Sequence, residues 1–452
     1  MTDIKKYIRH IFWLFVIMFV SVTGYFVHFI FFVAPGITNS TLNPRVRINH
    51  EGRQRGNILD RNGQLLAYSE NDQRHYPFGT AFAHVVGHTA VGHSGIEERY
   101  NFSLTNLSNQ FFQRARHIAF ERVMVGDNVQ TTLDAGLQNH VYDILGTRRG
   151  SIIVMQPSTG NILAMVSYPT YDPNQVSENW SSLLNRADSP LINRATQGLY
   201  PPGSTFKTLT SSIAMRSYTN NFTNFTNHCM GYIIIDGNII RCFNNVAHGH
   251  MDMTTAFALS CNTYFVALAY EIGAYDFIYY MQDYFIPINF SLAHSPSQFN
   301  LSHNEHIGYL MQTSIGQGRT LMTPLHMTLL TNAISNGGIM HMPNVVRERF
   351  SFFSIFADNS YTIFTPEQSE KLQYMMIQVV NQGTGANASL TNGQLAGKTG
   401  TAENDAGASH GWFTGFIVDQ DLSITVILEN SGGTANVLPM VRNIMSYAKG
   451  NQ

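Results

Sequence analysis

The stretch Pro201-Pro202-Gly203-Ser204-Thr205-Phe206-Lys207 decides how we interpret the rest of this chain. Pro and Gly end the segment before it and let the backbone approach a ligand closely, and residues 208–215 can form a helix. Ser204 and Lys207 are three residues apart, so they lie on one face of that helix within contact distance. Taken alone, the spacing more often marks a helix-capping serine and a solvated lysine.

The same pair of residue types also suits nucleophilic catalysis. A serine hydroxyl is a weak nucleophile until a neighbouring base removes its proton. An amine can be that base only when burial or a second cation lowers its pKa. A helix N-terminus adds N–H donors and a positive field, which both stabilise an oxyanion. Ser204 and Lys207 therefore predict a nucleophile and its base if other residues support them.

Two further stretches give that support. Ser260-Cys261-Asn262 ends the apolar segment 254–259, and Lys398-Thr399-Gly400-Thr401 follows residues 394–397. Each is weak alone. The order S-x-x-K, S-x-N and K-T-G on one chain, with long spacings, is typical of penicillin-binding proteins and serine β-lactamases.

The composition argues against several other classes of protein. The chain has 452 residues, enough for two or three domains, and a net charge of −2. No basic tract predicts nucleic-acid binding and no acidic tail predicts disorder. Charged residues make up only 12%, about half the usual share. After residue 6 the only lysines are Lys207, Lys371, Lys398 and Lys449. Two of these four lie in the motifs, which favours a role for their titratable amines.

The N-terminal segment has the pattern of a membrane anchor. Residues 1–10 carry Lys5, Lys6 and Arg9, and the 24 residues 11–34 are nearly all apolar, long enough to span a bilayer. No Lys or Arg follows until Arg45. The charge asymmetry predicts a cytoplasmic tail at 1–10, a transmembrane helix at 11–34 and an extracytoplasmic remainder. A cleaved signal peptide is the alternative, but the long apolar region without a clear small-x-small site favours an uncleaved anchor.

Residues 35–149 predict a small mixed, non-catalytic module. Residues 55–67 have the pattern strand, turn, strand, with Asn62-Gly63 as the turn. A short helix is predicted at 95–98, a strand at 127–133 and a helix from Asp134 toward Leu145.

Residues 150–452 predict a second, larger domain. Strands are expected at 151–156, 161–167, 395–401, 412–418 and 422–429, with a hairpin at 233–240 turning at Asp236-Gly237. Helices are expected near 252–271, 322–336, 366–381 and 437–449. Strands at both ends with helices between them predict an α+β domain with a central antiparallel sheet covered by helices on both faces.

With these motifs in order, the chain resembles the class B penicillin-binding proteins, which are membrane-anchored peptidoglycan D,D-transpeptidases. The resemblance runs over nearly the whole length, and it is carried by residues 55–67, 95–98, Asn193-Arg194-Ala195, 201–207, 260–262, 316–325 and 398–402. β-Lactamases lack the motifs of the first module. The resemblance implies a pedestal or dimerisation-like module at 35–149, shorter than is common in the family, and a transpeptidase domain at 150–452.

The resemblance also implies roles for the motif residues. Ser204 is the expected nucleophile of the acyl-enzyme and Lys207 its base, while Ser260 relays a proton to the leaving amine and Asn262 holds the substrate's peptide amide. Lys398 is the expected second cation, which keeps Lys207 neutral and attracts the terminal carboxylate of the substrate. Thr399, Gly400 and Thr401 form the substrate-binding strand. The two threonine hydroxyls bind that carboxylate, and the N–H groups of Ser204 and Thr401 form the oxyanion hole.

The expected partners follow from the same resemblance. They are peptidoglycan stem peptides ending in D-Ala-D-Ala on lipid-linked precursor strands, β-lactam antibiotics and a polytopic membrane glycosyltransferase, with no metal and no organic cofactor. Roles in cell division, in elongation and cell shape, and in sporulation are all compatible with the motifs. A D,D-carboxypeptidase or β-lactamase, which uses water as acceptor, and a non-enzymatic penicillin sensor are the alternatives.

The three cysteines, Cys229, Cys242 and Cys261, have no metal-ligand spacing. A two-residue turn would pair Ile235 with Asn238 and place Cys242 opposite Gly231. A Cys229–Cys242 disulfide and free thiols therefore both remain possible in an exported domain, and Cys261 is expected to be free.

Overall fold

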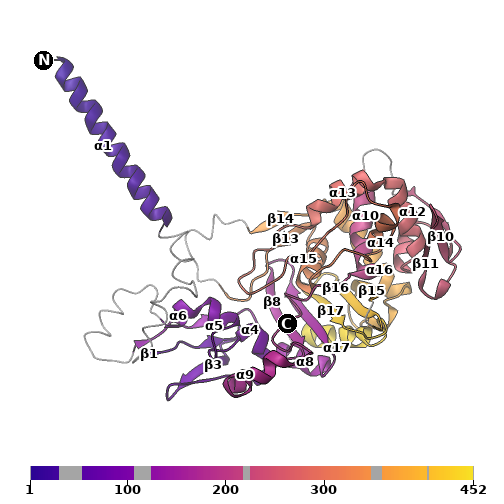
Figure 1. The fold of residues 1–452 in the computed structure, drawn as a ribbon, viewed down its shortest axis with the longest axis horizontal. Helices are drawn as coiled ribbons and strands as arrows, with labels where there is room; N and C mark the ends of the chain where they lie inside the picture. Colours follow the sequence, from indigo (N-terminus) through magenta and orange to yellow (C-terminus); the bar gives the residue numbers. More distant parts are fainter. Residues whose placement is uncertain are drawn as a thin grey trace.

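The computed structural model describes residues 2–29, 53–105, 124–216, 224–347, 359–404 and 407–450. Helix α1 (Thr2–His28) stands apart from the remaining elements in Figure 1. Its segment Lys5–His28 is long and apolar enough to cross a membrane, and it is not buried by the rest of the chain. The helix overlaps the predicted span at 11–34, of which residues 30–34 lie outside the described residues.

The first module is built on a four-stranded sheet in the order β4-β3-β2-β6. Its elements are β2 (Ile58–Leu59), β3 (Leu65–Glu70), β4 (Gln73–His75) and β6 (Val129–Gln130), with a separate parallel pair of β1 (Arg53–Gln54) and β5 (Met124–Val125). Helices η2 (Gly79–Phe82), α4 (Ala83–Val86), α5 (Gly95–Arg99) and α6 (Asn101–Thr105) cover it. The helix predicted at 95–98 is confirmed. The strand predicted at 127–133 is shorter, because Thr131 leaves this sheet to bridge Val346.

The predicted hairpin at 55–67 is present, but its turn is wider than an Asn-Gly turn. The Asp60 carboxylate accepts hydrogen bonds from the N–H groups of Asn62 and Gln64, at 2.7 and 2.8 Å. Nearby, the buried carboxylate of Glu97 pairs with Arg55 at 2.6 Å and with Arg74 at 2.7 Å. This cluster joins the two motifs of the first module, because Arg55 belongs to one and Glu97 to the other. Removing one partner of such a buried ion pair would leave an uncompensated charge.

The second domain is organised by a five-stranded antiparallel sheet in the order β15-β16-β17-β7-β8. Its strands are β7 (Gly150–Gln156), β8 (Asn161–Tyr168), β15 (Leu395–Ala402), β16 (His410–Ile417) and β17 (Ser423–Leu428). Neighbouring residues of β7 point to opposite faces. Ile152 and Val154 therefore join one hydrophobic core while Ile153 and Met155 join the other. The sheet is covered on both faces, as predicted.

The two faces carry different helices (Figure 1). One face packs against α8 (Ala135–Leu145) and α17 (Val437–Gly450), which share a core with it. The other packs against α15 (Pro324–Ser335), with α16 (Pro366–Gln382) against β15 and α15. The remaining helices are η3 (Pro173–Gln175), α9 (Val176–Asn185), η4 (Gly203–Phe206), α10 (Lys207–Arg216), η6 (Phe243–Asn245), α11 (Met253–Ala258), α12 (Asn262–Ile272), α13 (Ala274–Met281), η7 (Gln282–Tyr284), α14 (Ile307–Ser314) and η9 (Ala386–Ala388).

Three small antiparallel pairs complete the domain: β9 (Asn227–Cys229) with β12 (Gly249–Met251), β10 (Tyr232–Ile235) with β11 (Asn238–Arg241), and β13 (Ile339–His341) with β14 (Ser360–Thr362). The predicted pairing of Ile235 with Asn238 is confirmed. The single helix predicted near 252–271 is wrong, because the chain breaks between α11 and α12. Ser260 has a φ of 57° there, outside the helical region, and Cys261 caps α12.

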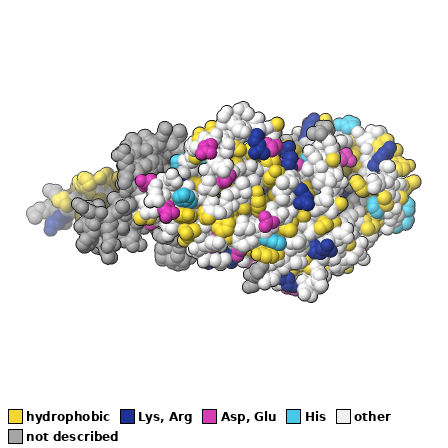
Figure 2. Space-filling model, turned by 90° about the horizontal axis from the view of Figure 1, so that it is seen from below, with side chains coloured by type: hydrophobic (Ala, Val, Ile, Leu, Met, Phe, Trp, Pro, Cys, Tyr) yellow, Lys and Arg dark blue, Asp and Glu magenta, His cyan; other side chains and the backbone are white. Residues whose placement is uncertain are grey.

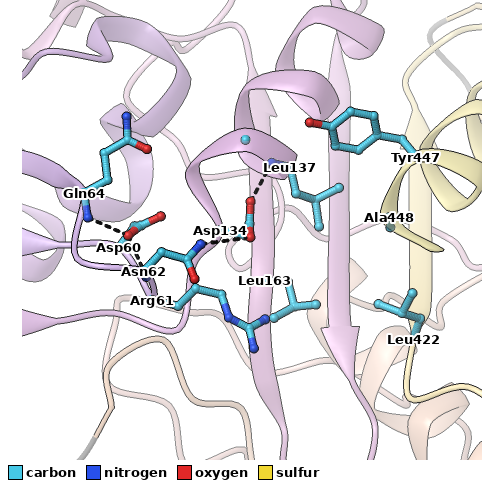
Figure 3. A pocket seen from close by; sticks show the side chains of 11 residues that line it. Asp60, Arg61, Asn62, Gln64, Asp134, Leu137, Leu163, Leu422, Tyr447 and Ala448 are labelled. Carbon is cyan, nitrogen blue, oxygen red and sulfur yellow. Dashed lines mark hydrogen bonds between the residues drawn. The ribbon is translucent and has the colours of Figure 1, made fainter. Parts of the chain in front are cut away.

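A cavity of about 310 Å³ lies where the first module meets the second domain. Figure 3 shows the turn residue Asn62 facing Asp134 at the start of α8, the side chain of Arg61 near Leu163, and Tyr447 of α17 across the opening. Asp134 accepts a hydrogen bond from the Leu137 N–H at 2.9 Å, so it caps α8. Residues of the S-x-x-K, S-x-N and K-T-G motifs are not among those that line this cavity, so it does not mark the predicted chemistry.

The surface is poor in charge, as the composition requires. Figure 2 shows small, interspersed patches of both signs on a mostly uncharged face. Hydrophobic and histidine side chains gather at the end of the molecule that carries β10 and β11. The exposed apolar residues of that region include Met230, Ile234, Ile239 and Phe243.

Candidate active site

Ser204 lies in the single turn η4, directly before α10, and is partly exposed. Gly203 has a φ of 54°, and a Cβ at that position would lie 2.7 Å from the carbonyl oxygen of Thr401. The N–H of Gly203 donates to the carbonyl of Gly316 at 2.8 Å. Glycine is therefore required here, because no other residue allows the serine turn to lie this close to β15.

The K-T-G sequence lies on β15, an edge strand of the sheet. It pairs with β16, so that Lys398 faces Thr414 and Thr401 faces Gly411. The Thr401 carbonyl accepts a long hydrogen bond from the Gln317 side chain, at 3.4 Å. This arrangement leaves the outer edge of β15 beside η4, with the serine turn and the strand in contact.

The three motifs meet at the hydroxyl of Ser260. Lys398 Nζ donates to Ser260 Oγ at 2.9 Å, and Lys207 Nζ lies 3.3 Å from the same oxygen. Lys207 Nζ also donates to the Ser260 carbonyl and to Asn262 Oδ1, both at 2.7 Å. Both lysine side chains are fully buried. Residues separated by almost 200 positions in the sequence therefore form one hydrogen-bonded group.

The two lysines influence each other's protonation. Burial lowers the pKa of Lys207 to about 8, while the thiol groups of Cys261 and Cys242 oppose that shift. Burial also places the pKa of Lys398 well below its ordinary value, and the charge of Lys207 adds to this effect. Two buried amines that share one hydroxyl titrate as a pair. Near neutral pH the pair therefore favours one proton over two.

The side chain of Asn262 is held at both ends. Its oxygen accepts from Lys207, and its Nδ2 donates to the Arg241 carbonyl at 2.8 Å. The end of β11 is thereby tied to the site.

A second group of reactive side chains adjoins the site. Cys229, Cys242, His248 and Cys261 place one donor atom each within 4.8 Å of all the others. The sulfur of Cys242 lies 3.6 Å from that of Cys229 and 3.7 Å from that of Cys261, and Cys229 Sγ lies 3.4 Å from His248 Nδ1. All three thiols are free. Cys261 caps α12, so this group is joined directly to the Ser260–Asn262 turn.

The geometry of this Cys-His cluster (Cys229, Cys242, His248 and Cys261) fits a tetrahedral metal ion. Bonds of about 2.3 Å to sulfur give ligand–ligand edges of about 3.8 Å, and three cysteines with one histidine form a common zinc set. The N–H groups of Gly231 and Tyr264 donate to the sulfurs of Cys229 and Cys261 at 3.3 and 3.5 Å. Such outer contacts orient metal ligands.

The sequence predicts no metal site, yet this cluster is a candidate for one. That expectation relied on spacing along the chain, whereas the fold brings together Cys229 of β9, Cys242 just after β11, His248 of a loop and Cys261 at the cap of α12. The predicted position of Cys242 opposite Gly231 is confirmed by a 2.9 Å backbone hydrogen bond. Cys229 lies on a different pair, opposite Gly249. Sequence reasoning also missed His248, because its position six residues after Cys242 does not match a metal-ligand spacing.

Comparison with known proteins matches two parts of the chain to family models. Residues 150–446 match the family model of the penicillin binding protein transpeptidase domain, and residues 55–129 match that of the penicillin binding protein A dimerisation domain. The chain is 31% identical to peptidoglycan D,D-transpeptidase PbpA of Mycolicibacterium smegmatis, with 89% of each chain covered. It is 28% identical to peptidoglycan D,D-transpeptidase MrdA of Haemophilus influenzae, covering 83% of this chain and 69% of that one.

Solved structures also resemble this fold. Penicillin-binding protein A from M. tuberculosis, as an imipenem acyl-enzyme complex, superposes with a TM-score of 0.79 at 28% identity, covering 88% of this chain and 99% of the other. The D,D-transpeptidase domain of a peptidoglycan glycosyltransferase from Eggerthella lenta gives 0.79 at 27% identity, covering 89% and 99%. Since the match includes both modules and the three motifs, the chain belongs to the class B penicillin-binding proteins.

Proposed function

We propose that this protein cross-links peptidoglycan by acyl transfer from a D-Ala-D-Ala stem peptide, through an acyl-enzyme on Ser204, to an acceptor amine. The observation that carries the proposal is the convergence of Lys207, Lys398 and Asn262 around Ser260, beside the Ser204 turn. The relatives named above are D,D-transpeptidases, and one similar solved structure is a β-lactam acyl-enzyme.

The first step of acylation depends on which of the two lysines carries the proton that they share. A substrate carboxylate that arrives beside Lys398 favours the proton on that amine, which leaves Lys207 neutral. Neutral Lys207 then takes the proton of the Ser204 hydroxyl as the oxygen attacks the carbonyl carbon. Ser260, in contact with both amines, passes a proton to the nitrogen of the leaving D-Ala, so the peptide bond breaks as the ester forms.

The edge strand β15 supplies the binding groups. Thr399 and Thr401 offer hydroxyls to the substrate carboxylate, with Gly400 between them allowing close approach. Thr399 Oγ1 already hydrogen-bonds the hydroxyl of Thr384, which orients it. The N–H groups of Ser204 and Thr401 form the oxyanion hole, where loss of one donor costs about 3 kcal/mol in the transition state.

A β-lactam mimics the acyl-D-Ala-D-Ala end, so we expect penicillin to add covalently to Ser204 and to persist. Intact mass followed by peptide mapping over time measures both the site and the lifetime. Ser204→Ala is the control and should stay unlabelled. Loss of the adduct within seconds would instead support a β-lactamase or carboxypeptidase, which uses water as acceptor. An adduct on another residue would refute the assignment of Ser204.

We further propose that α1 anchors the protein with its N-terminus in the cytoplasm and its catalytic domain outside. Lys5, Lys6 and Arg9 precede the apolar stretch, which supports this orientation. A glycosyltransferase embedded in the membrane would supply the glycan strands that the transpeptidase joins.

The orientation has a direct test. Protease added outside intact protoplasts should digest the Ser204 domain, while a cytoplasmic marker protein stays intact. Protection of the Ser204 domain until the membrane is permeabilised would contradict the single-anchor topology.

We also propose that the Cys-His cluster holds a zinc ion with a structural role. Its donor set and edge lengths support this, and all four positions are supplied by the protein, as in structural sites. The residues Cys242 and Cys261 would then tie the β10–β11 hairpin to the cap of α12. The metal takes no part in the acyl transfer proposed above.

A further inference from the structure

The carboxylate of Glu429 joins three segments behind the Ser204 turn. Glu429 follows the end of β17, and its side chain is 11% exposed. Its Oε1 accepts hydrogen bonds from Arg194 Nε at 2.8 Å and from the Tyr200 hydroxyl at 2.7 Å. Its Oε2 accepts from Arg149 Nε at 2.9 Å, on the exposed side.

Tyr200 lies four residues before Ser204 and is fixed by its surroundings. Its N–H and carbonyl both pair with Met322, at 3.1 and 2.8 Å. Its ring stands edge-on to that of Trp412, with centroids 6.1 Å apart. Trp412 in turn donates from Nε1 to the carbonyl of Pro201 at 3.1 Å. The side chain of Tyr200 is thus part of the support of the chain that leads to the nucleophile.

The carboxylate of Glu429 is paired with Arg194, which belongs to the Asn193-Arg194-Ala195 motif. Its side chain is 5% exposed, and it also donates to the carbonyls of Asp188 and Ser189 at 2.7 and 3.1 Å. Burial alone would raise the pKa of Glu429, but the Tyr200 hydroxyl and Arg194 lower it below its ordinary value. An ionised carboxylate accepts stronger hydrogen bonds than a neutral group, so the contact with Tyr200 is firm.

Residues 200–203 are therefore held at three points. Glu429 holds the start through the Tyr200 hydroxyl, Trp412 holds the middle, and the Gly316 carbonyl holds the end. Gly203 has no spare room against Thr401. A shift at Tyr200 is consequently passed to Ser204 and changes its distance from the oxyanion-hole strand.

We propose that Glu429 is a positioning residue for Ser204, acting through the Tyr200 hydroxyl. This inference rests on the proposed function and adds a residue that touches neither the substrate nor the reacting atoms. It also gives a role to Arg194, which keeps the carboxylate ionised and oriented.

Tyr200→Phe tests the proposal with the smallest change, because it removes only the hydroxyl and leaves the ring against Trp412. Acylation by a chromogenic or fluorescent β-lactam is followed by stopped flow, which separates non-covalent binding from the acylation step. We expect the acylation rate constant to fall about 10- to 100-fold, as for a small misplacement of a reacting group, with non-covalent binding unchanged.

Arg149→Gln is the matched control. It removes the exposed contact to Oε2 of the same carboxylate, and circular dichroism checks that both variants keep the wild-type fold. Glu429→Gln introduced into Tyr200→Phe should add little further loss of the acylation rate constant, because the hydroxyl through which Glu429 acts on Ser204 is already gone, even though the change also weakens the pairs with Arg194 and Arg149. Where the double variant does not fold, the acylation rate constants of Tyr200→Phe and Arg149→Gln are sufficient to test the inference.

The inference would be overturned by acylation of Tyr200→Phe at the wild-type rate, or by an equal loss in Arg149→Gln. A loss confined to non-covalent binding would do the same. Wild-type protein in the same assay keeps the proposals separate. If it does not acylate at Ser204, the proposed function fails; if it does and Tyr200→Phe matches it, only the role of Glu429 fails.

Discussion

Replacing Lys207 by Arg is expected to lower the rate of Ser204 acylation by about 10²- to 10⁴-fold, the usual contribution of a general base. Arginine keeps the positive charge but cannot lose its proton in a protein. The buried amine that donates to Asn262 and the Ser260 carbonyl would be replaced by a permanent cation. The second-order rate constant with a fluorescent penicillin measures the loss, and circular dichroism with the melting temperature checks that the variant folds.

Lys398→Arg is the matched variant. Lys398 is equally buried and contacts the same hydroxyl, but its proposed task is that of a fixed charge for the substrate carboxylate. We therefore expect a smaller loss, expressed mainly in the binding of the antibiotic before acylation. Equal losses in the acylation step for both variants would contradict this division of roles.

The pH dependence gives a second measure of the same base. Burial lowers the pKa of Lys207 to about 8, and only the neutral amine can accept the serine proton. Acylation should therefore rise about tenfold per pH unit in the acidic range and level off above the pKa. In Lys207→Arg this rise should disappear, because arginine stays protonated over the range. A pH profile that is the same in both proteins would exclude Lys207 as the base.

The other large effect concerns the Cys-His cluster. Purified protein should contain about one zinc ion per chain, and a strong chelator should lower its melting temperature. A metal that binds only the folded state stabilises it by about 4 kcal/mol at a thousand times its Kd. Elemental analysis measures the zinc, and cobalt substitution should give the absorption bands of a tetrahedral thiolate site.

His248→Ala removes one ligand and is expected to lower the zinc content and the melting temperature together. His250→Ala is the control, because His250 lies on the adjacent strand β12, with its ring 4.4 Å from that of His228, outside the four-donor group. Thiol counting on denatured, unreduced, metal-free protein completes the test. Three free thiols and bound zinc support the site. One free thiol without zinc would instead support the Cys229–Cys242 disulfide.

Much of the fold could be predicted because the local patterns agree with it. Strands β7 and β8 contain continuous apolar runs, which are typical of strands buried on both faces of a sheet. The helix–strand order around them determines an antiparallel sheet with helical layers. The failure at residues 252–271 is also informative. Helical propensity predicts no break there, yet Ser260 has a positive φ. In this conformation its carbonyl accepts a hydrogen bond from Lys207 and its hydroxyl accepts one from Lys398.

The sequence by itself determined the class of chemistry. Three short motifs in one order leave few families to consider, and within them Ser204 and Lys207, which share one turn, are the predicted nucleophile and base. The anchor likewise follows from a local apolar run. Each motif, and the apolar run, is recognised from residues that are close together in the chain.

The tertiary structure alone decided which distant residues share a partner. The meeting of Lys207 and Lys398 at one hydroxyl, the four donors of the Cys-His cluster, and the link from Arg194 through Glu429 to Tyr200 all join segments from different elements. No local pattern encodes such contacts, because they depend on sheet order and on the direction of each side chain. Burial then changes the protonation of those groups, and burial exists only once the chain has folded.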